Sequence, residues 1–191
     1  MLSDLAFALA NAGFLITVIT SKRGPSANLL AAEIISGVEI LRIGSVGVCS
    51  SNFIGRAMEY LEFYAAATWL LLARVARGDI IVAKTDPPLV SVFAGLSARS
   101  RSGKLVNWLQ VLYPEVANKL GFYFARGPTG WMLRKARDAV LRSACMNVAI
   151  GDRMAVLLRK HVAAHKIKVI PNWVDDSKIQ PLAASITGFS K

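Results

Sequence analysis

Polar residues stand at or shortly after the ends of several short apolar runs in this 191-residue chain. Lysine and arginine attract anionic groups such as phosphates, and carboxylates and amides hydrogen-bond to hydroxyl groups. Residues of this kind at neighbouring strand ends are typical of a ligand-binding edge, although loops are polar in most proteins. The candidates for this edge are Lys84, Asp86, Gln110, Glu115 and Arg153.

The elements that must position these residues alternate along the chain. The apolar runs are short and rich in β-branched residues, as buried parallel strands are, and the longer segments between them have helical periodicity. This alternation predicts an α/β domain with a Rossmann-like, mostly parallel sheet and helices on both faces. The carboxyl ends of its strands would bring the candidates to one edge. We expect strands over 14–20, 38–44, 79–84, 104–110, 145–150 and 167–170, and helices over 2–12, 55–77, 88–98, 127–144 and 152–164.

The pattern begins on a helix, which starts at Leu2 and stops at Gly13. In a doubly wound fold the first strand is central, and the loop after it approaches the ligand. We therefore expect a sheet that lacks its usual first strand and has two exposed inner edges. The expected organisation is a domain over 1–170, incomplete at its start, an exit segment over 171–182 that resembles an interdomain linker, and a tail over 183–191.

Charge and composition limit the classes of partner. The chain has 23 basic and 12 acidic residues, a net charge of +11, which favours an anionic partner such as a phosphate-bearing ligand or an acidic membrane surface. Cys49 and Cys145 lie far apart without a CxxC spacing, which indicates a reducing compartment. No signal peptide is visible, and the apolar stretch 63–73 is too short to span a bilayer, which needs roughly 20 residues. We expect a cytoplasmic protein, either free in the cytoplasm or peripheral on the inner face of the plasma membrane.

Three further patterns have simpler explanations than a site. His161 and His165 have helical metal-ligand spacing but lack a third ligand, so we expect no metal. The segment 44–47 is no GxGxxG motif, which leaves a dinucleotide site without support. No DNA- or RNA-binding motif is present, so nucleic acid is not expected as a partner. A basic helix face with an aromatic residue is either solvated or touches anionic lipid, and its membrane-facing candidates are Trp131, Arg134, Lys135 and Arg142.

Several residues of the candidate edge can also be explained by an ordinary structural role. Lys84 at a strand end is compatible with simple solvation. Asp86, before two prolines, is a suitable helix N-cap, and Glu115 after Pro114 suits the first turn of a helix. The residues argue for a site as a set more strongly than any one of them does alone.

Four segments together resemble the amino-terminal half of bacterial glycosyltransferases, the retaining, two-domain GT-B enzymes of the group 1 or family 4 type. Enzymes of this family build lipopolysaccharide, capsule and exopolysaccharide. The resemblance covers most of residues 2–182, and its most specific parts are "YPEVANKLG" and "IPNWVD". The segments are "LSDLAFALANAGFLITVIT", "VAKTDPPLVSVFAGLSAR", "NWLQVLYPEVANKLG" and "VIPNWVDDSKIQPL".

The resemblance implies a division of labour between two domains. In such enzymes the amino-terminal domain binds mainly the acceptor, and the carboxyl-terminal domain holds the nucleotide-sugar donor. The resemblance implies that this chain is the acceptor-binding half, inactive alone, with a sugar or lipid-linked acceptor and a carboxyl-terminal donor domain as partners. No cofactor is expected here, because the nucleotide-sugar would bind to the other domain. Asn172, Trp173 and Asp175 are then expected on the hinge side of the cleft.

The chain also departs from the family pattern. Val111 stands where family members usually have an aspartate, and the acidic EX7E-type motif of the donor domain is absent. No residue is therefore assigned as catalytic. Two other functions stay open, namely a non-catalytic α/β module that binds an anionic membrane surface or a partner chain, and a nucleotide-binding Rossmann enzyme without its phosphate loop.

Overall fold

The computed structural model describes residues 2–22, 30–44, 53–85, 87, 89–112 and 127–173. From α2 onward helices and strands alternate, as the sequence predicts, whereas three strands follow α1 in succession. The helices are α1 (Leu2–Asn11), α2 (Phe53–Arg74), α3 (Val90–Ser100), α5 (Gly127–Ser143), α6 (Asp152–Leu158) and the 3-10 helix η2 (Ala164–Lys166). The strands are β1 (Ile16–Ser21), β2 (Ala32–Ile35), β3 (Val38–Ile43), β4 (Ile80–Lys84), β5 (Lys104–Leu109), β6 (Met146–Ala149) and β7 (Ile167–Val169).

The larger sheet contains four parallel strands in the order β4-β5-β6-β7. Each strand is joined to the next by a crossover that contains a helix, and α3, α5 and α6 pack against the sheet. Apolar side chains from α3 and α5 meet the strands in one buried cluster, and those of α6 meet the strands and α5 in a second. This architecture confirms the predicted α/β, Rossmann-like fold with a parallel sheet flanked by helices.

The smaller sheet has three strands in the order β1-β3-β2, with β1 parallel and β2 antiparallel to β3. The sequence analysis expects no strand between 20 and 38, and this expectation is wrong, because β2 lies there. Ile35 pairs with Val38, so Ser36 and Gly37 form a two-residue hairpin turn. Both have positive φ, 48° and 80°, as the favoured hairpin turn requires. The Ser36-Gly37 pair is the sequence signal that could have indicated this hairpin.

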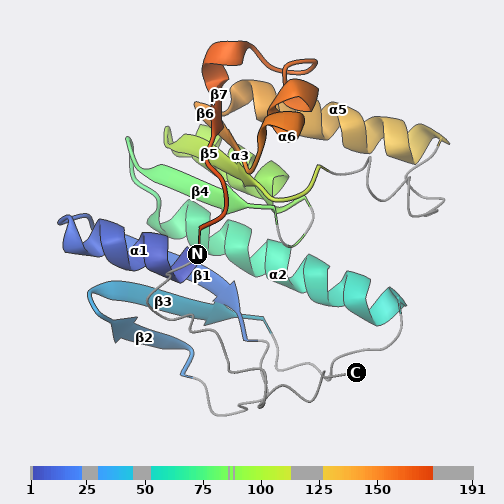
Figure 1. The fold of residues 1–191 in the computed structure, drawn as a ribbon. Helices are drawn as coiled ribbons and strands as arrows, with labels where there is room; N and C mark the ends of the chain where they lie inside the picture. The colour runs from blue at the N-terminus through green and yellow to red at the C-terminus, as the bar shows by residue number, and fades with distance from the viewer. Residues whose placement is uncertain are drawn as a thin grey trace, which may run out of the picture.

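The two sheets are separate among the described residues, in agreement with the two exposed inner edges expected from the sequence. In Figure 1 the strands of the smaller sheet lie below those of the larger one, and β1 is nearest to β4. β1 and β4 are each the last strand of their own sheet, so one edge of each has no partner strand in the described part of the chain. The helix α2 packs against both β3 and α3, so it connects the two halves.

A pair of asparagines lies at the centre of the larger sheet. Asn107 of β5 and Asn147 of β6 are both fully buried, and the Nδ2 of Asn107 donates to the Oδ1 of Asn147 at 2.9 Å. The Nδ2 of Asn147 donates in turn to the carbonyl of Leu141, which connects the sheet to α5. Buried amides are stable only when they are hydrogen-bonded, so this pair fixes the register of β5 against β6.

Candidate functional site

One row of side chains crosses the larger sheet on a single face, near the carboxyl ends of its strands. The strand register aligns Lys84 of β4 with Trp108 of β5, Trp108 with Val148 of β6, and Val148 with Lys168 of β7. Residues aligned in neighbouring strands project to the same face of a sheet. The row therefore has a lysine at each end and a tryptophan between them.

The exit segment after β7 returns across this row. Trp173 stacks on Trp108, with ring centroids 5.5 Å apart and planes 9° from parallel. Trp108 is only 4% exposed, and its indole N–H has no hydrogen-bond acceptor in the described part of the chain. A stacked aromatic pair with a polar N–H combines an apolar surface with a hydrogen-bond donor. The sequence-predicted hinge residue Trp173 thus lies against the larger sheet.

A second contact joins the same two segments. The side-chain amides of Gln110 and Asn172 hydrogen-bond to each other in both directions, at 3.2 Å and 3.4 Å. Thr85 fixes the start of the loop after β5, because its Oγ1 accepts the backbone N–H groups of Gln110 at 2.9 Å and Val111 at 3.4 Å. The ends of β4 and β5 and the segment after β7 therefore meet at one place, although Thr85 and Asn172 are far apart in sequence.

The structure brings together some of the sequence-predicted residues and leaves others untested. Lys84 and Gln110 lie at the ends of adjacent strands, and Asn172 and Trp173 contact β5 or its end. Arg153 is exposed in the first turn of α6, just after β6. The remaining candidates, Asp86, Glu115 and Asp175, lie outside the described residues.

We define the carboxyl-edge cluster as Lys84, Thr85, Trp108, Gln110, Lys168, Asn172 and Trp173. Sequence reasoning did not select Trp108 or Lys168 as site residues, although both were visible in principle. Lys168 is a charged residue between Ile167 and Val169, and in a strand it projects away from the face that buries them. Trp108 sits at the same alternate position of its own strand, but nothing in the sequence indicates the aromatic stacking.

A small hollow lies on the opposite face of the sheet, between β5, α3 and α5. About 40 Å³ of it is accessible to the centres of water molecules, and its lining is mostly apolar. Asn107 and Ser91 line it, and the Oδ1 of Asn107 and the Oγ of Ser91 are buried without a partner in the described part of the chain. This volume suits ordered water that satisfies the two oxygens, and it is too small for a sugar.

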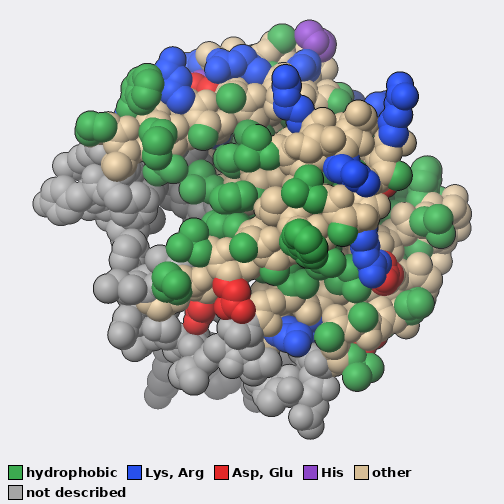
Figure 2. Space-filling model, turned by 180° about the vertical axis from the view of Figure 1, so that it is seen from behind, with side chains coloured by type: hydrophobic (Ala, Val, Ile, Leu, Met, Phe, Trp, Pro, Cys, Tyr) green, Lys and Arg blue, Asp and Glu red, His purple; other side chains and the backbone are tan. Residues whose placement is uncertain are grey.

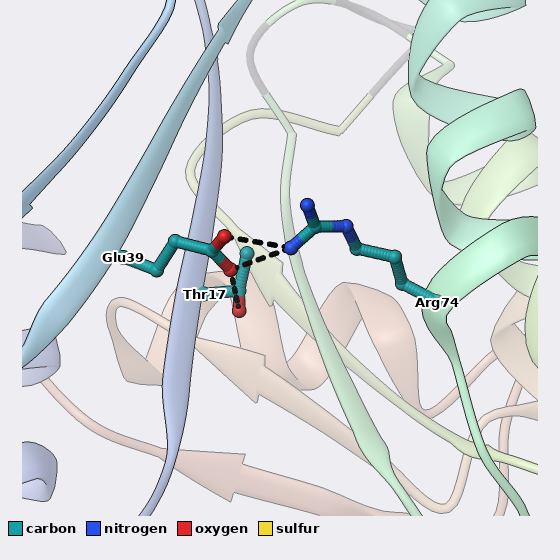
Figure 3. Close-up of polar contacts among 3 residues, drawn as sticks. All are labelled: Thr17, Glu39 and Arg74. Atoms are coloured by element: carbon teal, nitrogen blue, oxygen red, sulfur yellow. Dashed lines mark hydrogen bonds and ion pairs between the residues drawn. The ribbon is translucent and has the colours of Figure 1, made fainter.

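The clearest electrostatic effect lies at the other end of the strands, in the smaller sheet. Arg74, at the end of α2, donates to both carboxylate oxygens of Glu39, at 2.7 Å and 2.8 Å (Figure 3). The hydroxyl of Thr17 on β1 donates to the same carboxylate at 2.9 Å. Hydrogen bonds from Arg74 and then Thr17 hold the pKa of Glu39 below its usual value of about 4.5. This cluster stabilises the charged glutamate and fastens α2 to the smaller sheet.

The helix α5 carries most of the predicted membrane-facing residues on its exposed side. Trp131 is 59% exposed, and the ammonium of Lys135 lies 5.6 Å from the centroid of its ring. Arg142 is exposed about two turns beyond Lys135. Arg134 is half-buried and has interactions with neighbouring groups. Figure 2 shows hydrophobic and basic side chains together along the upper left, where α5 lies, and hydrophobic side chains in the middle, over α2.

Neither histidine nor cysteine forms a metal site in the described part of the chain. The Nδ1 of His161 contacts the carboxylate of Asp138 at 3.2 Å, and Asp138 also accepts from Arg137. Cys145 is a free thiol that donates to the carbonyl of Leu105. None of the described helices is long and apolar enough to cross a lipid bilayer.

Comparison with known proteins identifies the domain type. The sequence matches Glycosyltransferase Family 4 over residues 1–178, which is most of the chain. This chain belongs to Glycosyltransferase Family 4. The exit segment up to residue 178 lies within the match, so the part of the chain that carries Asn172 and Trp173 belongs to the family domain.

A solved structure supports the same fold. The glycosyltransferase Family 4 domain described here superposes on sucrose-phosphate synthase from Thermosynechococcus elongatus with a TM-score of 0.67 and 18% sequence identity. The match covers 94% of this chain and 43% of the synthase, so this chain spans less than half of that protein's length. At this identity the likeness shows the fold alone. No curated protein matches the sequence significantly.

Proposed function

We propose that this Family 4 domain binds the acceptor in a glycosyl transfer reaction of cell-surface polysaccharide synthesis. The acceptor would be a lipid-linked or saccharide molecule, and a separate carboxyl-terminal domain would hold the nucleotide-sugar donor. The observation that carries the proposal is the contact of the exit segment with the end of β5, through Gln110–Asn172 and Trp108–Trp173. In parallel α/β sheets ligands bind at this edge.

The charges at the edge favour a particular class of acceptor. Lys84 and Lys168 stand at the two ends of the row, and Arg153 is exposed beside the end of β6. Two lysines in the row that contains Trp108, with a third cation at the same edge of the sheet, suit a ligand that carries both a diphosphate and an apolar or sugar surface. A polyprenyl diphosphate sugar has this chemistry, so we favour a lipid-linked acceptor.

Catalysis by this chain alone is not expected. Glycosyl transfer requires stabilisation of the leaving diphosphate and a closed, dry cleft in which the acceptor hydroxyl meets the anomeric carbon. The cluster at the carboxyl edge supplies the acceptor side of such a cleft. We expect purified 1–191 to bind acceptor without transferring sugar, and transfer by this chain alone would overturn this part of the proposal.

The experiment that tests acceptor binding is a titration with a short-chain polyprenyl diphosphate sugar, followed by tryptophan fluorescence. Lys84→Ala and Arg153→Ala should each raise the Kd by about 10-fold or more, because each removes a charge-assisted contact to phosphate. Lys160→Ala, a change of the same charge at an exposed position beyond α6, is the matched control and should leave the Kd unchanged. Equal effects of the three substitutions would indicate non-specific charge attraction and would contradict the assigned site.

A second candidate function, favoured by α5, is binding to an anionic membrane surface. Trp131 and Lys135 form an exposed aromatic and basic pair, and Arg142 extends the basic face. Tryptophan favours the interface of a bilayer, and each basic residue near an anionic surface contributes about 1 kcal/mol. This surface would place the acceptor-binding edge close to lipid-linked substrates, and it would equally serve a non-catalytic membrane module.

Liposome flotation separates these roles. Vesicles with 30% phosphatidylglycerol should bind the chain at low salt, and the double change Lys135→Gln with Arg142→Gln should reduce binding by about 10-fold or more. Vesicles of phosphatidylcholine alone are the control. Retention of full binding by the double variant would remove α5 as the docking surface, whereas membrane binding without acceptor binding would favour the non-catalytic module.

A further inference from the structure

The hollow between β5, α3 and α5 lies at the same end of the sheet as the carboxyl-edge cluster. Its lining includes Thr85, Val111 and Leu112, which follow the ends of β4 and β5, and it is partly open rather than sealed. Thr85 also holds the start of the loop that carries Gln110, because its Oγ1 accepts the N–H of that residue at 2.9 Å. The hollow therefore adjoins the proposed acceptor-binding edge.

The first polar group in the hollow is a buried amide oxygen. Asn107 is fully buried, and its Oδ1 has no hydrogen-bond partner among the residues that the structure describes. The neighbouring amide fixes this orientation, because the Nδ2 of Asn147 donates to the carbonyls of Leu141 and Lys166. Asn147 thus presents its Oδ1 to the Nδ2 of Asn107, at 2.9 Å. The Oδ1 of Asn107 is left as an acceptor, which requires a donor from an occupant of the hollow.

The second polar group is a hydroxyl. Ser91 lies in the first turn of α3, and its Oγ is buried without a partner in the described ranges of the chain. A hydroxyl can donate as well as accept, so Ser91 can donate to an oxygen of the occupant. Buried polar atoms are unfavourable until they are hydrogen-bonded. The hollow therefore suits a group that has both a donor hydrogen and an acceptor oxygen.

Charge and size restrict this group further. Arg137 is the charged residue in the lining, and the carboxylate of Asp138 lies 2.8 Å from its Nη2 and neutralises it. The hollow therefore favours a neutral occupant over an anion, and its mostly apolar lining favours one with an apolar part. Its volume of about 40 Å³ has room for about three water-sized groups.

We propose that the hollow receives the acetamido substituent of an acceptor sugar, an inference that rests on the acceptor-binding function proposed above. The amide N–H of the substituent donates to the Oδ1 of Asn107, its carbonyl accepts from the hydroxyl of Ser91, and its methyl group contacts the apolar lining. The methyl, the carbonyl carbon and the oxygen match the size of the hollow, while the sugar ring stays outside at the edge. A hydroxyl substituent lacks the apolar part, and a carboxylate or phosphate is charged.

The test compares two acceptors that differ only in this substituent. Short-chain polyprenyl diphosphates that carry N-acetylglucosamine or glucose are titrated into the chain, and tryptophan fluorescence gives each Kd. The acetamido ligand should bind about 10-fold more tightly, because it alone satisfies the buried oxygens. Ser91→Ala should reduce this preference to about 3-fold or less, by weakening the binding of the acetamido ligand only.

The matched control is Ser97→Ala in the same helix. Ser97 is fully buried, its Oγ donates to the carbonyl of Phe93, and it does not line the hollow. This substitution should leave the preference unchanged. Binding of both ligands without a preference, or an equal loss of preference in both variants, would overturn the acetamido subsite and leave acceptor binding at the edge intact.

A second measurement does not depend on the lipid diphosphate. N-acetylglucosamine or glucose alone is added to labelled protein, and nuclear magnetic resonance follows the side-chain amide of Asn107. The signal should shift with N-acetylglucosamine only, and Ser91→Leu, which fills part of the hollow, should abolish the shift. This result supports the subsite even if neither diphosphate ligand binds and the proposed acceptor class is wrong. Equal shifts with both sugars, or no shift with either, would contradict the subsite.

Discussion

The two sheets of this domain are stabilised in different ways. The β4–β7 sheet has two buried clusters of helix and strand side chains and a fully buried asparagine pair at its centre. The β1–β3 sheet buries few large side chains among the described residues, chiefly Val38 and Leu41, and is connected by polar contacts such as Arg42 with Glu33. The strands of both sheets contain isoleucine or valine, so the difference in burial follows more from helix cover and strand neighbours than from β-propensity.

The two sheets also differ in their relation to the candidate site. The carboxyl-edge cluster belongs entirely to the larger sheet and its exit segment, where the surrounding core is well packed. A site held by buried elements keeps its geometry better than one on a thin, exposed sheet. The smaller sheet contains none of these residues, and one edge of its strand β1 has no partner strand in the described part of the chain. Four predictions test this contrast, from the largest effect to the smallest.

The largest effect is expected in the core of the larger sheet. Leu158 of α6 is fully buried, and Leu158→Ala should lower the free energy of unfolding by about 2–5 kcal/mol, through lost burial and an unfilled cavity. Ile34→Ala, in the smaller sheet at 75% exposure, is the comparison and should cost less than about 0.5 kcal/mol. Chemical denaturation measures both, and similar losses would contradict the contrast between the sheets.

The asparagine pair should give the next largest effect. Asn147→Ala removes the acceptor of Asn107 and the donor to Leu141, which should cost about 1–3 kcal/mol because buried polar groups lose their partners. The double change Asn107→Leu with Asn147→Leu should recover part of this loss, since no buried amide is then left unpaired. Denaturation curves of the single and double variants test this, and strictly additive losses would show that the pair does not act as a unit.

The stacked tryptophans should contribute a smaller amount. Trp173→Ala should lower the free energy of unfolding by about 0.5–1.5 kcal/mol and change the near-ultraviolet circular dichroism that arises from coupled indoles. Trp131→Ala, an exposed tryptophan on α5, is the control and should change neither quantity appreciably. An unchanged spectrum for Trp173→Ala would mean that the exit segment does not rest on β5 in solution.

The smallest effect concerns the ion pair that fastens α2 to the smaller sheet. The lowered pKa of Glu39 means that its charge stabilises the fold above the usual glutamate pKa, and that this contribution is lost as pH falls through the lowered folded pKa. Glu39→Gln should therefore cost up to about 1 kcal/mol at pH 7 and almost nothing at strongly acidic pH.

Substitution of Arg74 provides the control for this pH dependence. In an Arg74→Gln background, which removes the largest cause of the lowered pKa, Glu39→Gln should cost less at pH 7. Thermal unfolding at several pH values measures the difference. A cost of Glu39→Gln that stays the same from pH 7 to strongly acidic pH would contradict the electrostatic role.

The sequence predicts the larger sheet well and the smaller one less well, for a physical reason. Runs such as 79–84 and 104–110 are short and largely apolar and stand between segments of helical periodicity, so the sequence pattern marks them clearly as strands. The strand β2, over 32–35, is only four residues long and mostly exposed, and only the Ser36-Gly37 turn indicates it. Edge strands carry weak patterns because little of them is buried.

The candidate edge was predictable as a location, but not in its contacts. Gln110 and Asn172 follow predicted strands, and their shared edge follows from parallel topology alone. Their mutual hydrogen bonds, and the stacking of Trp173 on Trp108, depend on the path of the exit segment, which no local pattern encodes. The separation of the two sheets was also predictable only in outline. The sequence indicates it solely because the pattern begins on the helix at Leu2 where a doubly wound fold would begin on a strand.

The most direct test of the central claim is to map acceptor binding onto the chain by nuclear magnetic resonance. A short-chain polyprenyl diphosphate sugar is titrated into labelled protein while the side-chain amides of Gln110 and Asn172 and the indole N–H groups of Trp108 and Trp173 are followed. Acceptor binding at the carboxyl-edge cluster predicts saturable shifts of these signals, with Trp69 and Trp131 unchanged. Saturable shifts elsewhere, with these four signals unmoved, would contradict the assignment.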